Sequence, residues 1–147
     1  DLDMKASYHF NEASLVLPDA YGLADRSRQM LEIETSTGTK LTLIVARGTA
    51  DDDSLGTFLE KGLAEHRRSL RGFNLLSCNE RRYPDLEGVE LRFQFVDKKM
   101  GPMFHHEFHC VFGSYRLGFH VISAVADAEA CDGWAQAMLE SVKLRED

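Results

Sequence analysis

Apolar and polar residues alternate with a period of two over most of this chain, which predicts a protein built mainly of β-strands. Two such runs, 28–34 and 41–47, flank a threonine-rich segment in which Gly38 supplies the positive φ of a tight hairpin turn. Short turns also separate the other runs, and strands joined by short turns pair antiparallel. The remaining predicted strands are 7–10, 14–17, 74–82, 89–97, 103–112 and 115–125.

Two segments instead repeat their apolar residues every three to four positions, which predicts amphipathic helices. The first follows the capping residues 51–54, three aspartates and a serine, and ends at Gly72. The second is capped by Asp127 and carries an apolar stripe from Cys131 to Val142. Helices and antiparallel strands in this order predict an α+β fold, a curved antiparallel β-sheet with both helices packed on one face.

The length of 147 residues is that of one domain, and no linker or internal repeat divides it. We expect a single domain over residues 4–147, and we interpret residues 1–3 as a cloning remnant before Met4. A hydrophobic content of 44% excludes a disordered chain, and no apolar run approaches the ~20 residues of a membrane span. The protein is therefore not expected to be embedded in a membrane.

The net charge of -7 repels the phosphate backbone, so a nucleic acid is not an expected partner. The three cysteines are an odd number without a CxxC pair, which argues against a disulfide framework and for a reducing compartment. No secretion signal opens the chain. These features predict a cytoplasmic protein.

Alternation sends neighbouring side chains to opposite faces of the predicted sheet. One face collects large apolar residues such as Leu43, Phe93 and Phe119, and we expect it to meet both helices. The other face mixes small, β-branched and hydrogen-bonding residues, whereas a solvated face usually carries long charged side chains. We interpret it as a binding surface, although a third layer, a terminus of the chain or a dimer partner would also cover such a face. Its residues are Thr42, Ile44, Ala46, Arg92, Gln94, Val96, His105, Glu107, His109, Gly118, His120, Ile122 and Ala124.

The segment 104–110, Phe-His-His-Glu-Phe-His-Cys, is the main candidate for chemistry. On a strand His105, Glu107 and His109 share one face, and two imidazoles with a carboxylate can bind zinc or iron. The outer two histidines are about 13 Å apart along a strand, so all three residues cannot reach one ion. One adjacent pair with His120 on the neighbouring strand can. A polar row of side chains on a binding face is the interpretation that we favour over a metal site, and we expect no metal and no cofactor.

Other chemical motifs are incomplete. Residues 37–40 lack the order of a phosphate loop, and the segment 113–115 lacks the second glycine of a nucleophile elbow. The acidic run 51–53 lacks the ligand order of a calcium loop. No nucleophile, base and orienting group occur at a consistent spacing, so we expect the protein not to be an enzyme.

The order of short motifs along the chain resembles that of the Eag proteins, which are DcrB-like chaperones with the Mog1/PsbP fold encoded beside type VI secretion effectors. Each motif is short, and their order and spacing together carry the resemblance over nearly the whole chain. The matching segments are YHFNEASL at 8–15, LPDAY at 17–21, LIVAR at 43–47, LRGF at 70–73, FQF at 93–95, EF at 107–108 and GWAQAM at 133–138.

The resemblance implies a cytoplasmic, non-enzymatic homodimer that shields the N-terminal transmembrane segments of a secreted effector and delivers it to the spike of the secretion apparatus. In this family the strand before the hairpin contributes apolar contacts to the client. The matching positions are Arg28 and Met30, of which Arg28 departs from the apolar pattern. The expected client-binding residues are Arg28, Met30, Thr42, Ile44, Ala46, Arg92, Gln94, His105, His109, Gly118, His120 and Ile122.

Two alternatives remain open. An exported DcrB- or PsbP-like lipoprotein shares the fold, and a signal sequence upstream of Met4 in the gene distinguishes it. A small-ligand or metal-binding module uses His105, Glu107, His109 and His120, and a ligand or metal retained on purification distinguishes it. The client, the dimer geometry and any direct contact with the spike protein are not determined by the sequence.

Overall fold

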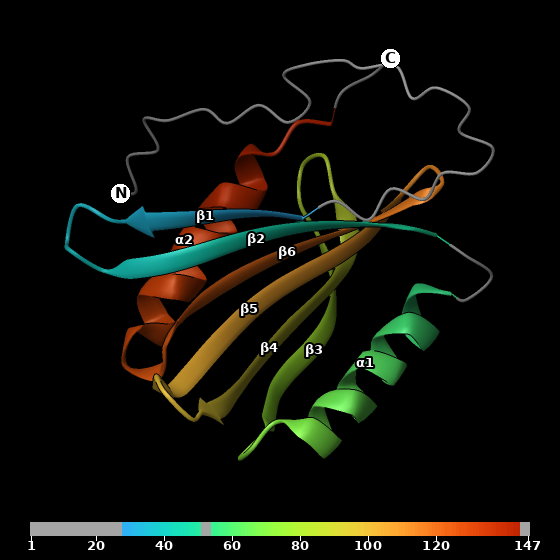
Figure 1. Ribbon diagram of the computed structural model, residues 1–147. Coiled ribbons are helices and arrows are strands. Elements are labelled where there is room, and N and C mark those ends of the chain that lie inside the picture. The colour runs from blue at the N-terminus through green and yellow to red at the C-terminus, as the bar shows by residue number, and fades with distance from the viewer. Residues whose placement is uncertain (1–27, 51–53, 145–147) are drawn as a thin grey trace, which may run out of the picture.

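The computed structural model describes residues 28–50 and 54–144, which form a six-stranded antiparallel sheet with two α-helices (Figure 1). The strands lie in the order β1-β2-β6-β5-β4-β3, so β2 pairs with a strand distant in sequence. The predicted α+β class is confirmed. The elements are β1 (Arg28–Glu34), β2 (Lys40–Thr49), α1 (Leu55–Ser69), β3 (Asn74–Arg82), β4 (Glu87–Asp97), β5 (Gly101–Phe112), β6 (Tyr115–Ala124), the 3-10 turn η1 (Val125–Asp127) and α2 (Ala128–Ser141).

Local signals in the sequence fix the ends of these elements. Gly38 adopts the positive φ expected of the β1–β2 turn, and Gly72 adopts a positive φ just after α1. The Ser54 hydroxyl accepts a hydrogen bond from the Thr57 amide at 3.1 Å and caps α1. Asp127 occupies the capping position of α2, as predicted, but makes no side-chain capping bond there. The predicted strands 7–10 and 14–17 and the aspartates 51–53 lie outside the described residues.

The two helices pack on opposite faces of the sheet, so the prediction that both share one face is wrong. On one face, α2 buries its apolar stripe, including Cys131, Ala135 and Leu139, against the aromatic residues of the central strands. On the other face, Leu59 and Leu63 of α1 pack against β4. Figure 1 shows α2 behind β1, β2 and β6 and α1 beside β3.

The register of β4 explains the error. Asp97 pairs with Gly101 across a turn in which the Asp97 carboxylate accepts hydrogen bonds from the amides of Lys99 and Met100. This turn aligns Phe93 with His105, although Phe104, one residue away, is apolar like Phe93. A shift of one residue exchanges the two faces of a strand. The apolar residues of β4 therefore pack under α1, and both faces of the sheet have a core.

Within the described ranges, neither helix is long and apolar enough to span a membrane. All three cysteines, Cys78, Cys110 and Cys131, are free thiols, as their odd number predicted.

Candidate functional site

The sheet face that carries α1, here called the site face, holds most of the residues predicted to bind a partner. The pairing register aligns them in rows that run across β1, β2, β6 and β5. The first row is Arg28, Ala46, Gly118 and His109, the second is Met30, Ile44, His120 and Glu107, and the third is Glu32, Thr42, Ile122 and His105. Each row ends on β5 in a histidine or a glutamate, so the polar side chains gather near the middle of the sheet.

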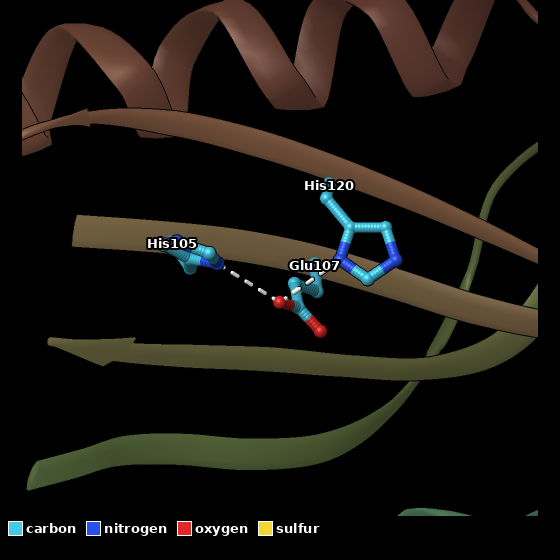
Figure 2. Close-up of side chains that lie close together, drawn as sticks. All are labelled: His105, Glu107 and His120. Carbon is cyan, nitrogen blue, oxygen red and sulfur yellow. Dashed lines mark hydrogen bonds and ion pairs between the residues drawn. The ribbon is translucent and has the colours of Figure 1, made fainter. Parts of the chain in front are cut away.

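Glu107 lies at the centre of three imidazoles, those of His105, His109 and His120, and these four residues form the histidine–glutamate cluster. Figure 2 shows His105 and His120 on either side of Glu107. Its Oε2 is 3.0 Å from Nδ1 of His105 and 3.0 Å from Nδ1 of His120. Its Oε1 is 2.9 Å from Nε2 of His109. The outer histidines of β5 thus contact different oxygens of one carboxylate, and the adjacent pair His105 and Glu107 meets His120, as the strand geometry allowed.

The cluster is buried but not sealed. Glu107 is only 4% exposed, while the side chains of His105 and His120 are 17% and 23% exposed. Burial alone would raise the pKa of Glu107, but the hydrogen bonds from the three imidazoles outweigh it and hold that pKa well below its ordinary value. Glu107 is therefore an ionised carboxylate inside the protein, compensated by its imidazole neighbours.

Gly118 provides the room for two of these rings. It lies opposite His109 in the register and two residues before His120 on the same strand. A Cβ at this position would lie 3.0 Å from His120 Nε2 and 3.1 Å from His109 Nδ1. The glycine therefore favours this packing, because a Cβ there would press both rings by a few tenths of an ångström.

The part of the site face on β1, β2 and β6, here called the strip, consists of Met30, Thr42, Ile44, Ala46 and Ile122. Met30 is 63% exposed, whereas Ile44 in the middle of the strip is buried, with 7% exposed. Thr42, Ala46 and Ile122 are half-buried. The predicted contact residue Arg28 is exposed at the end of β1. The strip is thus mainly apolar and partly accessible along one side of the cluster.

Arg92 and Gln94, also predicted to bind a client, lie on the opposite face, and this part of the prediction is wrong. They alternate with Leu91 and Phe93, which pack on the site face, so they point toward α2. Arg92 forms two hydrogen bonds with the carboxylate of Asp132 on α2, at 3.0 and 2.7 Å. Arg92 therefore joins α2 to the sheet.

The opposite face also holds a polar network that no sequence pattern predicted. His106 Nδ1 is 2.6 Å from Asp132 Oδ1, and its Nε2 is 3.2 Å from Glu90 Oε2, a charge contact without the alignment of a hydrogen bond. The Tyr83 hydroxyl donates to the same Glu90 oxygen at 2.6 Å. The network also includes Arg92. Its members come from the β3–β4 turn, from β4 and β5 and from α2, and no local motif signals such an arrangement.

The charges in this network stabilise one another. Contact with His106 is the main reason that the pKa of Glu90 falls from 4.5 to about 2; burial opposes this shift, and the hydrogen bond from Tyr83 adds to it. Burial would lower the pKa of His106, but its two carboxylate neighbours raise it above 6.5. Burial and the contact with Glu90 raise the pKa of Tyr83. The network, in which His106 is buried and Glu90, Arg92 and Asp132 are half-buried, joins α2 to the sheet by ion pairs.

No protein-family model matches this chain, and no curated protein matches it. Among solved structures, the crystal structure of PA94 from Pseudomonas aeruginosa is similar, with a TM-score of 0.74 and 21% sequence identity. The match covers 95% of this chain and 96% of PA94, which is described as a protein of unknown function and a candidate regulator. This similarity shows a shared fold over almost the full length of both chains.

Proposed function

We propose that this protein is a cytoplasmic, non-enzymatic chaperone of the Eag type, with the Mog1/PsbP fold, that binds an apolar transmembrane helix of a type VI secretion effector on the strip. The observation that carries the proposal is the partly accessible apolar strip beside α1. The motif order of the Eag proteins supports the choice of client. The same resemblance supports a homodimer that hands its effector to the secretion spike.

The strip has the composition that a membrane helix needs from a water-soluble partner. Ile44 and Ile122 offer branched apolar surface, and Ala46 allows a close approach of the helix backbone. Met30 adds a flexible apolar side chain that adapts to different sequences. Thr42 supplies a hydroxyl, which can bond to polar atoms of the client as it would within a membrane bundle. Charged Arg28 and Glu32 border this surface on β1.

The dimensions also suit a single helix. A membrane span of ~20 residues is ~30 Å long and about 10–12 Å wide. The distance from β1 to β6 is about 10 Å, which matches the width of the helix, and the strip from Thr42 to Ala46 covers roughly 13 Å of its length along β2. Because α1 already packs on β3, β4 and β5 of the same face, a client helix along β2 would lie beside α1 and extend that layer.

Shielding is needed because such a segment does not stay dispersed in water. Exposed apolar surface costs about 25 cal/mol per Å², which drives aggregation or premature membrane insertion. A strip that covers one side of the helix lowers this cost, and the second protomer of a dimer can cover another part. The proposal therefore requires a client with apolar N-terminal helices, encoded near this protein.

The test is co-expression with the N-terminal region of the effector encoded beside this gene, followed by co-purification and affinity measurement. Met30→Asp and Ile122→Asp should each weaken binding by about 10- to 100-fold, because a carboxylate facing an apolar helix loses its water without gaining a partner. Ile44→Asp is a poor test variant, since Ile44 is buried and the substitution would destabilise the sheet itself.

Met100→Asp is the matched control. Met100 is 72% exposed in the turn between β4 and β5. Met100→Asp therefore makes the same substitution as Met30→Asp, but on an accessible surface away from the strip. Its client affinity and melting temperature should equal those of the unmodified protein. Equal client binding by Met30→Asp, Ile122→Asp and the control, with all three folded, would show that the strip is not the binding surface.

A further inference from the structure

The histidine–glutamate cluster contains the donor atoms and the spacing of a divalent metal site. We propose that His105 Nδ1, Glu107 Oε2 and His120 Nδ1 bind one zinc-type transition-metal ion, with water completing its coordination. The three ligand atoms lie within 4.8 Å of one another and come from two paired strands (Figure 2). This proposal rests on these side chains alone and is independent of any client on the strip.

Both imidazoles approach the same carboxylate oxygen. His105 Nδ1 and His120 Nδ1 are each 3.0 Å from Glu107 Oε2. Around a tetrahedral ion with bonds of about 2.0–2.2 Å, neighbouring ligand atoms are roughly 3.4 Å apart. Side-chain rotations that bring the three atoms to this spacing therefore convert the two contacts with Oε2 into a set of three ligands. From the sequence we expected no metal here, and the convergence of three ligand atoms changes that expectation.

His109 is suited to support the site from outside the coordination sphere. Its Nε2 is 2.9 Å from Glu107 Oε1, the oxygen that does not face His105 and His120. Carboxylates that bind metals are usually held by such a second hydrogen bond, which fixes their orientation. Gly118 leaves room for the His109 ring to take this position. His109 is therefore a positioning residue, and its loss should weaken binding less than loss of a ligand.

The donor set selects the class of ion. Two imidazoles with one carboxylate suit Zn²⁺ and its first-row neighbours, whereas Ca²⁺ and Mg²⁺ prefer oxygen ligands throughout. The buried thiol of Cys110 belongs to the core on the opposite face, so the site offers nitrogen and oxygen without sulfur. The partial exposure of the His105 and His120 side chains gives an ion a route from solvent.

The experiment titrates the full chain, freed of metal by a chelator, with Co²⁺ while its visible absorption is recorded, and then displaces Co²⁺ with Zn²⁺. Cys78 is an exposed thiol, so every protein carries Cys78→Ser to remove a competing ligand. We expect one Co²⁺ per chain with the intense bands of low coordination, displaced by one Zn²⁺. His105→Asn, His120→Asn and Glu107→Gln should each weaken Zn²⁺ binding more than about 100-fold, and His109→Gln by roughly 10- to 100-fold.

Two variants serve as matched controls. Glu90→Gln removes a half-buried carboxylate on the opposite face, and Glu87→Gln removes an exposed carboxylate of the same strand. Both should bind Zn²⁺ like the parent. If Glu107→Gln fails to fold, the variants His105→Asn and His120→Asn still test the metal site, because both side chains are partly exposed. Failure of the parent to bind Zn²⁺, or equal affinity in the folded ligand variants and the controls, would overturn the proposal.

Discussion

Protonation of Glu90 should destabilise the protein in acid by an amount that its contacts determine. The contact with His106 and the hydrogen bond from Tyr83 lower its pKa from 4.5 to about 2. Between these values the unfolded chain binds a proton that the folded chain does not, so stability falls as the pH falls. Such a shift corresponds to about 3 kcal/mol as an upper limit, and we expect roughly 2 kcal/mol after solvent screening is allowed for.

The assay compares urea unfolding of the parent and Glu90→Gln at several pH values. Other carboxylates also titrate in acid, so the informative quantity is the difference between the two free energies of unfolding. It should be roughly 2 kcal/mol near pH 6, begin to shrink near pH 4.5 and vanish near pH 2. In the parent, His106 adds no pH dependence well below its ordinary pKa of 6.5, because it is then protonated in the folded and in the unfolded chain. Glu90 is one of the groups that raise the pKa of His106, so the change in the difference below pH 5 is the part that reports Glu90 alone.

The matched control for this prediction is Glu87→Gln. Glu87 lies on the same strand and pairs with Arg82 at 3.0 Å, but both side chains are exposed. The substitution should change the free energy of unfolding by about 0–1 kcal/mol, as is usual for surface ion pairs. A difference between the parent and Glu90→Gln that stays constant from pH 6 to about 2 would refute the assignment of the effect to the ionised carboxylate.

Three further predictions concern packing and are measured by chemical denaturation. Phe108 is fully buried and packs edge-to-face with Tyr83, with 5.3 Å between the ring centroids. Phe108→Ala should therefore lower the free energy of unfolding by about 3–5 kcal/mol. A Cβ on Gly88 would lie 2.0 Å from the His109 carbonyl oxygen, so Gly88→Ala should force β4 and β5 apart and cost about 1–3 kcal/mol. Gly133→Ala in α2 meets no atom within 4 Å and should instead stabilise the protein by about 0.5–1 kcal/mol; a loss of stability there would contradict this account.

Elements with local signals were predictable from the sequence. The alternation of β1 and β2 and the turn at Gly38 predicted their hairpin, and the cap at Ser54 with the stop at Gly72 predicted α1. The segment around Glu107 was also identifiable, because its histidines and glutamate lie close together in the sequence of one strand. Strand geometry then correctly paired it with His120 on the neighbouring strand.

The arrangement of faces was not predictable, because both faces of the sheet are apolar. Leu91 and Phe93 fit a core equally well under either helix, and only the β4–β5 turn decides which residues of β5 they meet. For the same reason Arg92 was placed on the wrong face. The network of Glu90, His106 and Asp132 depends on this register and on the position of α2, which no local pattern encodes.

The buried carboxylate of Glu107 and the half-buried carboxylate of Glu90 have partners of different kinds. An ionised carboxylate inside a protein costs several kcal/mol unless partners compensate it, and well-packed apolar residues often serve stability as well. Glu90 joins strands and α2 through His106 and Asp132, so its partners explain it as a connection between elements. Among the residues that the structure describes, Glu107 makes its ring contacts only within β5 and β6, which already hydrogen-bond to each other along their backbones. Holding β5 to β6 therefore does not require Glu107 and its imidazoles, and this is the physical reason to look for a ligand at the partly exposed cluster.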